Sequence, residues 1–180
     1  MKSALFLACL AMSVSCFSQE IDDSKKNIKK GIIATKAGDL TPSTGRGYWL
    51  EVSAVKSSEG EVRLKFHGSG APVAFYMEPG DSSLRVSFAD GSIVFLVADK
   101  KNYTAPKVTK NYNTGTSTTS QYTFWSNEYV LNATNLALFK EKEIVNIGVS
   151  GHKTANSYTL DPEKKDFIRK ALALIETTTL

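Results

Sequence analysis

Apolar and polar side chains alternate strictly through the middle of this 180-residue chain. Val62, Leu64 and Phe66 alternate with charged or polar neighbours, which is the spacing of a strand with one buried face. The segment 48–55 alternates in the same way, and turn-forming residues at 57–60 separate the two. This pattern predicts an antiparallel hairpin that belongs to a larger sheet.

Further alternating segments follow, separated by turn-forming residues. Strands are expected at 72–77, 84–88, 93–98, 107–112, 121–126, 144–149 and 157–160. Gly68–Ser69–Gly70 is expected to break the chain, and Asp90–Gly91 predicts a tight type I′ turn. Segment 93–98 is apolar on both faces, which indicates a central strand. Residues 113–120 are rich in Ser and Thr and are expected to form a mobile tip.

Two helices are expected in the last third of the chain. Residues 132–142 include Leu136, Leu138 and Phe139 and indicate a short helix. Asp161–Pro162–Glu163 provides an N-cap, a proline in the first turn and an acidic residue, which together open a final amphipathic helix. The expected fold class is mainly β (α+β): an antiparallel sandwich or open barrel with a short helix and a C-terminal capping helix.

The N-terminus has the order of a secretory signal peptide. A basic residue, Lys2, precedes an uncharged apolar run and then a group of small residues. The apolar run is shorter than the ~20 residues that a membrane-spanning helix needs. We therefore expect a signal peptide at 1–18, a polar N-terminal segment at 19–45 and a single β-rich domain at 46–180.

Two processing routes are open for this N-terminus. Cleavage after Ser18 would leave Gln19 as the first residue of a secreted or periplasmic protein. Alternatively, residues 13–16 resemble the lipobox of bacterial lipoproteins, which implies a membrane anchor on Cys16. Both cysteines, Cys9 and Cys16, lie within the signal, so the mature chain is expected to be free of disulfides. This favours a bacterial periplasm or cell surface over a eukaryotic secretory route.

The charge balance gives no argument for nucleic-acid binding. Loss of Lys2 with the signal lowers the basic residues from 22 to 21 against 18 acidic ones, a net charge of +3. The basic segment Lys25–Lys30, or a lipid on Cys16, is the expected means of any peripheral membrane association.

The mature sequence assembles no catalytic, cofactor or metal motif. The segment around Ser150 misses the nucleophile-elbow pattern, because Gly151 falls one place too early. The two histidines, His67 and His152, lie too far apart to start a zinc motif. We expect no catalytic residue, no metal and no cofactor. A small carboxylate-dependent hydrolase stays an alternative, since paired carboxylates have no sequence spacing of their own.

Four aromatic residues are the candidate ligand-binding residues: Tyr112, Tyr122, Trp125 and Tyr129. They flank the Ser/Thr-rich segment, and exposed aromatic rings bind sugars and peptides. Packing in the core is the competing interpretation of the same residues. The leading expectation is an exported, non-enzymatic binding or accessory domain for a protein, glycan or small-molecule ligand.

Gly47–Tyr48–Trp49 resembles the Gly-x-Trp motif that opens the first strand of lipocalins. The resemblance implies a barrel that carries a small apolar ligand. The later Thr-Asp-Tyr-like turn of that family has no counterpart, because Asp99 and Tyr103 are too far apart.

Overall fold

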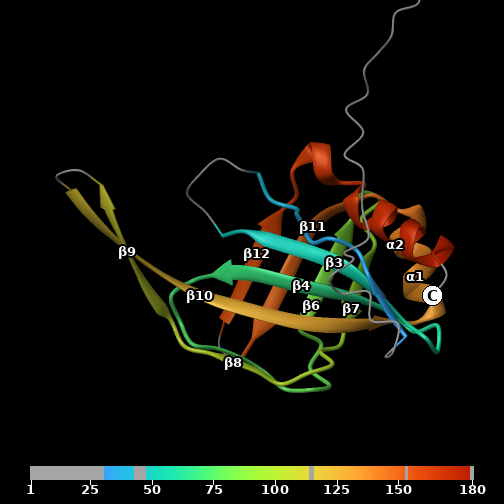
Figure 1. Cartoon of the computed structure of the whole chain (residues 1–180), viewed down its shortest axis with the longest axis horizontal. Helices are drawn as coiled ribbons and strands as arrows, with labels where there is room; N and C mark the ends of the chain where they lie inside the picture. Colours follow the sequence, from blue (N-terminus) through green and yellow to red (C-terminus); the bar gives the residue numbers. More distant parts are fainter. Residues whose placement is uncertain (1–30, 43–47, 114–115, 153, 179–180) are drawn as a thin grey trace, which may run out of the picture.

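The computed structural model describes residues 31–42, 48–113, 116–152 and 154–178. The expected signal peptide, Cys16, Lys25–Lys30 and Gly47 lie outside these ranges. The described chain is mostly antiparallel sheet with two short helices, the second at the C-terminus, which confirms the expected mainly β, α+β fold (Figure 1).

The larger sheet has the strand order β1-β3-β4-β10-β9, and β2 also pairs with β3. Its strands are β1 (Ile32–Ala34), β2 (Gly38–Asp39), β3 (Leu50–Ser57), β4 (Val62–Gly70), β9 (Lys107–Asn113) and β10 (Thr116–Leu131). The expected hairpin is β3–β4, with Ala54 opposite Leu64. β1 and β2 lie before residue 46, where the β-rich domain was expected to start, yet they are part of this sheet.

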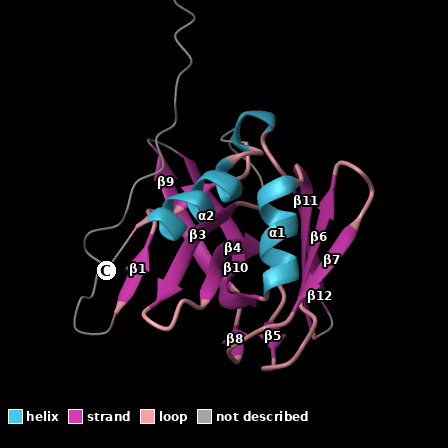
Figure 2. Ribbon diagram, turned by 90° about the vertical axis from the view of Figure 1, so that its right-hand side faces the viewer, coloured by secondary structure: helices cyan, strands magenta, loops and turns pink. Residues whose placement is uncertain are grey.

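The smaller sheet has the order β12-β11-β6-β7. Its strands are β6 (Leu84–Phe88), β7 (Ile93–Leu96), β11 (Ile144–Gly151) and β12 (Thr154–Thr159). A separate two-stranded ribbon pairs β5 (Phe75–Met77) with β8 (Asn102–Thr104). In Figure 2 the larger sheet stands on the left and the smaller on the right, an arrangement that fits a β-sandwich.

The expected chain break at Gly68–Gly70 is wrong, because β4 continues through these residues. A Cβ added to Gly68 would lie 2.9 Å from the backbone oxygen of Trp49 and 3.0 Å from the Trp125 ring. One added to Gly70 would overlap the side-chain amide of Asn156. Glycine serves here to let neighbouring groups approach the strand, rather than to end it.

The turn between β6 and β7 exists, but it is not the two-residue type I′ turn that Asp90–Gly91 predicted. The Phe88 amide donates to Ser92 O (3.0 Å), and the Gly91 amide donates to Phe88 O (3.0 Å). This leaves a three-residue loop, Ala89–Gly91, in which Gly91 has a φ of 83°. A glycine with positive φ at the end of a three-residue loop is a common hairpin alternative.

The prediction that 93–98 is a central strand is wrong. β7 is the terminal strand of the smaller sheet within the described chain, and Ile93, Phe95 and Val97 are exposed. Only the alternate residues Leu96 and Ala98 are buried. The apolar residues on the second face therefore do not reach the core.

The segment expected to be a mobile tip is largely strand. β10 begins at Thr116, and its first seven residues pair only with β9, from Thr116 opposite Asn113 to Tyr122 opposite Lys107. Pairing of β10 with β4 starts at Thr123. The result is a two-stranded arm that projects from the body, at the left of Figure 1.

Both predicted helices are present. α1 (Ala133–Glu141) is capped by Asn132, whose side chain accepts from the Asn135 amide (2.8 Å). Asp161 caps a short 3₁₀ turn, Pro162–Lys164, and α2 (Phe167–Thr177) follows as a separate helix. α2 buries Ile168, Ala171, Leu172 and Ile175 in the core. The helices lie together at the end of the molecule opposite the arm (Figure 1).

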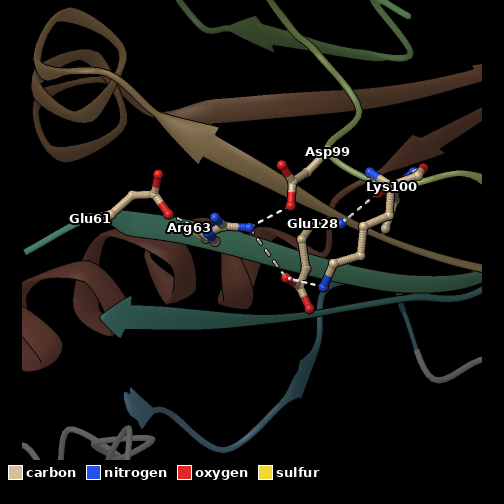
Figure 3. Close-up of polar contacts among 6 residues, drawn as sticks. Glu61, Arg63, Asp99, Lys100 and Glu128 are labelled. Carbon is tan, nitrogen blue, oxygen red and sulfur yellow. Dashed lines mark hydrogen bonds and ion pairs between the residues drawn. The ribbon is translucent and has the colours of Figure 1, made fainter. Parts of the chain in front are cut away.

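The two sheets are joined along one side by a network of charged side chains (Figure 3). Arg63 on β4 forms ion pairs with Glu61, Glu128 and Asp99, of which Asp99 follows β7. Lys100 pairs with Glu128 (2.8 Å), and the Asp99 amide donates to Glu128 O (3.1 Å). The chain leaving the smaller sheet is thus held against β4 and β10 of the larger one.

Candidate functional site

Three aromatic rings meet on the outer face of the larger sheet. Trp49 precedes β3, His67 lies on β4 and Phe124 lies on β10. The ring centroids of Trp49 and His67 are 4.9 Å apart, and those of Trp49 and Phe124 are 6.3 Å apart. The Nζ atom of Lys107 lies 6.0 Å from the centroid of the Phe124 ring. These four residues are called the outer aromatic cluster below.

Strand alternation explains why these side chains share a face. The neighbouring residues Leu50, Phe66 and Trp125 point inward and are buried. Because successive side chains of a strand point to opposite faces, Trp49, His67 and Phe124 point outward. The local sequence therefore sets the direction of each ring, and strand pairing brings the rings together.

Ser69 holds the cluster in place between β3 and β10. The Ser69 amide donates to Trp49 O (3.0 Å), and the Trp49 amide donates to the Ser69 hydroxyl oxygen (3.1 Å). Phe124 is the register partner of Ser69 on the other side. The backbone beneath the rings is thus hydrogen-bonded on adjacent strands, which orients them before any ligand arrives.

Polar side chains border the outer aromatic cluster. Glu51 and Ser126 are the register partners of His67 on its two sides, so both lie beside it on the outer face. His67 and Lys107 are exposed, while Trp49 and Phe124 are half-buried. The buried side of α2 faces the opposite, inner side of this sheet. The cluster therefore combines accessible ring surface with hydrogen-bonding groups at its border.

The four sequence-predicted aromatic residues do not form one site. Trp125 and Tyr129 are buried in the core, on the face of β10 opposite the outer aromatic cluster. Tyr122 is half-buried at the base of the arm, on the same side of β10 as Phe124. Tyr112 lies on β9, and its side chain is outside the described part of the structure.

The two buried aromatic residues have structural hydrogen bonds instead. The Tyr129 hydroxyl lies 3.0 Å from the Ser83 hydroxyl, and burial raises the pKa of Tyr129 to about 12. The Trp125 indole nitrogen donates to the Tyr158 hydroxyl, whose pKa burial also raises well above its ordinary value. Both phenols are therefore neutral at physiological pH and belong to the packing of the core.

Trp49, His67 and Phe124 were not among the predicted ligand-binding residues, although the sequence contained a signal for them. Trp49 and His67 occupy the polar-facing positions of the two clearest alternating segments, where a large ring has no core to fill. Phe124 lies between Thr123 and Trp125, whose side chains are buried and point inward. Sorting the aromatic residues by strand face would have separated Phe124 from Trp125.

A polar cleft of about 400 Å³ opens where β11 ends, lined by residues that include Tyr76, Glu78, Asp81, Ser83, Ser150 and His152. Its carboxylates already have structural partners: Glu78 pairs with Lys101 (3.3 Å), and Asp81 accepts from the Glu78 amide (2.8 Å). Ser150 lies in a strand that leads into a hairpin, so it lacks the strand-to-helix turn of a nucleophile elbow.

Within the described residues, no three or more His, Cys, Asp or Glu side chains lie together in a way that could hold a metal ion. The helices described are also too short or too polar to cross a bilayer. Comparison of the chain with protein-family models, with curated proteins and with solved structures gave no match.

Proposed function

We propose that this chain is an exported, non-catalytic binding domain that holds a glycan against its outer aromatic cluster. One observation carries the proposal: Trp49, His67 and Phe124 come from three adjacent strands and meet on a face that the described helices leave open. Rings in the core stabilise the fold, whereas half-exposed rings on a sheet face supply apolar area to a ligand.

A glycan fits the chemistry around the rings. One face of a pyranose ring carries mostly C–H groups, which pack on an aromatic ring, and its edge carries hydroxyl groups. Glu51 and Ser126 lie beside His67 and can accept or donate hydrogen bonds to such hydroxyls. A few polar groups around an apolar surface are the usual means of fixing a ligand's orientation.

The rest of the described structure supports a binding domain over the alternatives. The space between the sheets is filled by a continuous cluster of buried apolar side chains, which disfavours a carrier with an internal ligand. The carboxylates of the polar cleft, Glu78 and Asp81, are engaged in an ion pair and a turn, which disfavours a carboxylate-dependent hydrolase.

Binding is tested by titrating the protein with soluble polysaccharides, both neutral glucans and acidic polyuronates, and following tryptophan emission. The chain has two tryptophans, and only Trp49 reaches the surface. We expect a saturable change in emission with the wild type and none with Trp49→Phe, in which only buried Trp125 reports.

Trp49→Phe removes the fluorescent reporter as well as a ring, so affinity electrophoresis, which does not depend on fluorescence, then measures binding itself. Phe124→Ala should weaken binding at least tenfold, about 1.4 kcal/mol. Val130→Ala, on the same strand and face but away from the rings, is the matched control and should bind normally. Equal affinity of Phe124→Ala and wild type, or no binding of any polysaccharide, would refute the proposal that the ligand is a glycan. If the same rings are found to bind a protein instead, the proposed ligand becomes that protein.

Export is tested by the mass of the mature protein recovered from bacterial cell fractions. A chain that begins at Gln19 supports cleavage after Ser18, and a lipid on Cys16 supports the anchored alternative. A cytoplasmic protein that retains Met1 would contradict both.

A further inference from the structure

The polar cleft at the end of β11 is a concave site separate from the outer aromatic cluster. Its volume of about 400 Å³ lies within the ~300–1,000 Å³ of small-molecule sites. Its walls come from three segments of the chain: β5, the turn at 78–83 and the end of β11. None of the residues that line it belongs to the outer aromatic cluster.

Backbone hydrogen bonds hold the walls of the cleft together. The His152 amide donates to Tyr76 O (2.7 Å), and the Ser150 amide donates to Ser83 O (2.7 Å). A Cβ added to Gly151, between these two donors, would lie 2.8 Å from Tyr76 O. Glycine at this position therefore lets β5 lie directly against the end of β11, and the fold itself fixes the shape of the cleft.

An ammonium group of the chain itself lies at the edge of the cleft. The Nζ atom of Lys101 is 5.2 Å from the centroid of the Tyr76 ring and 3.3 Å from a carboxylate oxygen of Glu78. Both of these partners line the cleft. A cation within ~6 Å of the face of a tyrosine ring is attracted to it. Tyr103 packs edge-on against Tyr76, with ring centroids 6.2 Å apart, and extends the aromatic wall. This corner therefore has the chemistry of an ammonium site.

The cleft keeps an excess of negative charge after Lys101 is counted. The Glu78 amide donates to the Asp81 carboxylate (2.8 Å), which orients that carboxylate but does not neutralise it. Asp81 forms no ion pair within the part of the chain that the structure describes. Glu78, Asp81 and His152 do not lie together there in a way that could hold a metal ion. The aromatic wall and the separated carboxylates favour an organic cation.

We propose that this cleft binds a small alkyl diamine. One ammonium group takes the place of Lys101 beside the Tyr76 ring and Glu78, and the other pairs with Asp81. The alkyl chain between them packs against the tyrosine rings, which supply apolar surface. The Lys101 side chain is 61% exposed, so its move into solvent costs little.

Isothermal titration calorimetry with 1,4-diaminobutane at low ionic strength tests this binding. We expect saturable binding of one equivalent, and none of 1,4-butanediol, which has the same chain without charge. Asp81→Asn should weaken diamine binding at least tenfold. Asparagine keeps an oxygen that can accept from the Glu78 amide, so the turn is preserved. Glu59→Gln, in the exposed turn after β3, removes the same charge elsewhere and should bind as the wild type does.

A pair of lysine variants tests the displacement of the internal ammonium group. Lys101→Ala removes the competitor and should bind the diamine at least threefold more tightly. Lys100→Ala removes the same charge from the neighbouring position, where the ammonium group pairs with Glu128 (2.8 Å) instead of the cleft. This control should bind as the wild type does, because only Lys101 occupies the site.

Nuclear magnetic resonance locates the bound diamine. In ¹H–¹⁵N spectra of the wild type, the resonances that shift should be those of 76–83 and 150–152. The proposal is overturned by absence of saturable binding or by shifts confined to other residues. Equal affinities of Asp81→Asn and Glu59→Gln, or of Lys101→Ala and Lys100→Ala, would also overturn it. None of these measurements uses a polysaccharide, so they are independent of the proposed function.

Discussion

The indole nitrogen of Trp125 donates a 2.9 Å hydrogen bond to the hydroxyl of Tyr158 and so joins the larger sheet to the smaller one. The Tyr158 hydroxyl in turn donates to Ser69 O (2.8 Å). All three groups are buried, so the chain of hydrogen bonds replaces solvent for each of them. Ser69 also anchors Trp49, which connects the core to the outer aromatic cluster.

Removal of the Tyr158 hydroxyl should destabilise the fold. Tyr158→Phe leaves the Trp125 N–H without an acceptor and Ser69 O without this donor, at a cost of about 1–3 kcal/mol for an unsatisfied buried group. Urea unfolding measures the change. Tyr103→Phe, at a largely exposed ring, is the matched control and should stay within ~0.5 kcal/mol of the wild type. A Tyr158→Phe protein as stable as this control would contradict the role of the bridge.

Stability should fall between pH 10 and pH 12. Burial raises the pKa of Tyr129 to about 12, from an ordinary value of 10.0. Below pH 10 the phenol is neutral in both states. Above pH 10 the phenol ionises first in the unfolded state. This ionisation stabilises the unfolded state, so the free energy of unfolding falls.

The size of this alkaline effect follows from the shift. Two pKa units correspond to about 2.7 kcal/mol, lost progressively as pH rises toward 12. Urea unfolding at pH 9.0 to 11.5, values chosen to span the ~10 at which free tyrosine titrates, measures the slope. Tyr129→Phe should reduce the slope, and buried Tyr158, whose pKa is also raised, should account for part of what remains. An unchanged slope in Tyr129→Phe would show that other groups control alkaline unfolding.

Gly68→Ala should destabilise the protein by about 1–3 kcal/mol, the usual cost of overpacking. Its Cβ would approach the Trp49 backbone and the Trp125 ring within 3.0 Å, and the backbone oxygen cannot yield easily. Gly148→Ala is the control within a strand, because its nearest atom is 3.7 Å away. Thermal unfolding of both variants checks the prediction, and equal melting temperatures would refute it.

Loss of Arg63 should loosen the join between the sheets. Arg63→Ala leaves the carboxylates of Glu61, Asp99 and Glu128 without their common cation, and we expect a loss of about 1–2 kcal/mol because these groups are only partly solvated. The Asp99 amide, bonded to Glu128 O, should exchange its hydrogen faster. Lys101→Ala removes an exposed ion pair and should change neither measurement. Unchanged exchange at Asp99 in Arg63→Ala would contradict this role for the network.

Most strands and both helices could be predicted because their signals are local. Val62, Leu64 and Phe66 alternate within a single strand. Asn132 caps helix α1, and Asp161 caps the 3₁₀ turn that follows it. The predictions were wrong where residues that are distant in the sequence determine the local structure. Gly68 continues a strand because Trp49 and Trp125 approach it, and neither is near it in the sequence.

The candidate site depended still more on distant pairing. Alternation placed Trp125 and Tyr129 on one face of β10 and Phe124 on the other, which the residues alone could have indicated. That Phe124 meets Trp49 and His67 follows from the register of β3, β4 and β10. The register of β3 with β4 is set by the short turn that joins them, but no local pattern encodes the register of β10 with β4, since these strands are remote in the sequence.

By itself, the sequence determined the type of most elements and the side chains that share a face, because these follow from backbone geometry over a few residues. Only the tertiary structure decided which strands lie side by side beyond the predicted hairpin. The alternation of 48–55 and 62–67 was evident at once, yet strand order put Phe124 beside Trp49 and left Phe95 at an edge. Burial depends on neighbours that are remote in the chain, and their positions result from the free energy of the whole fold.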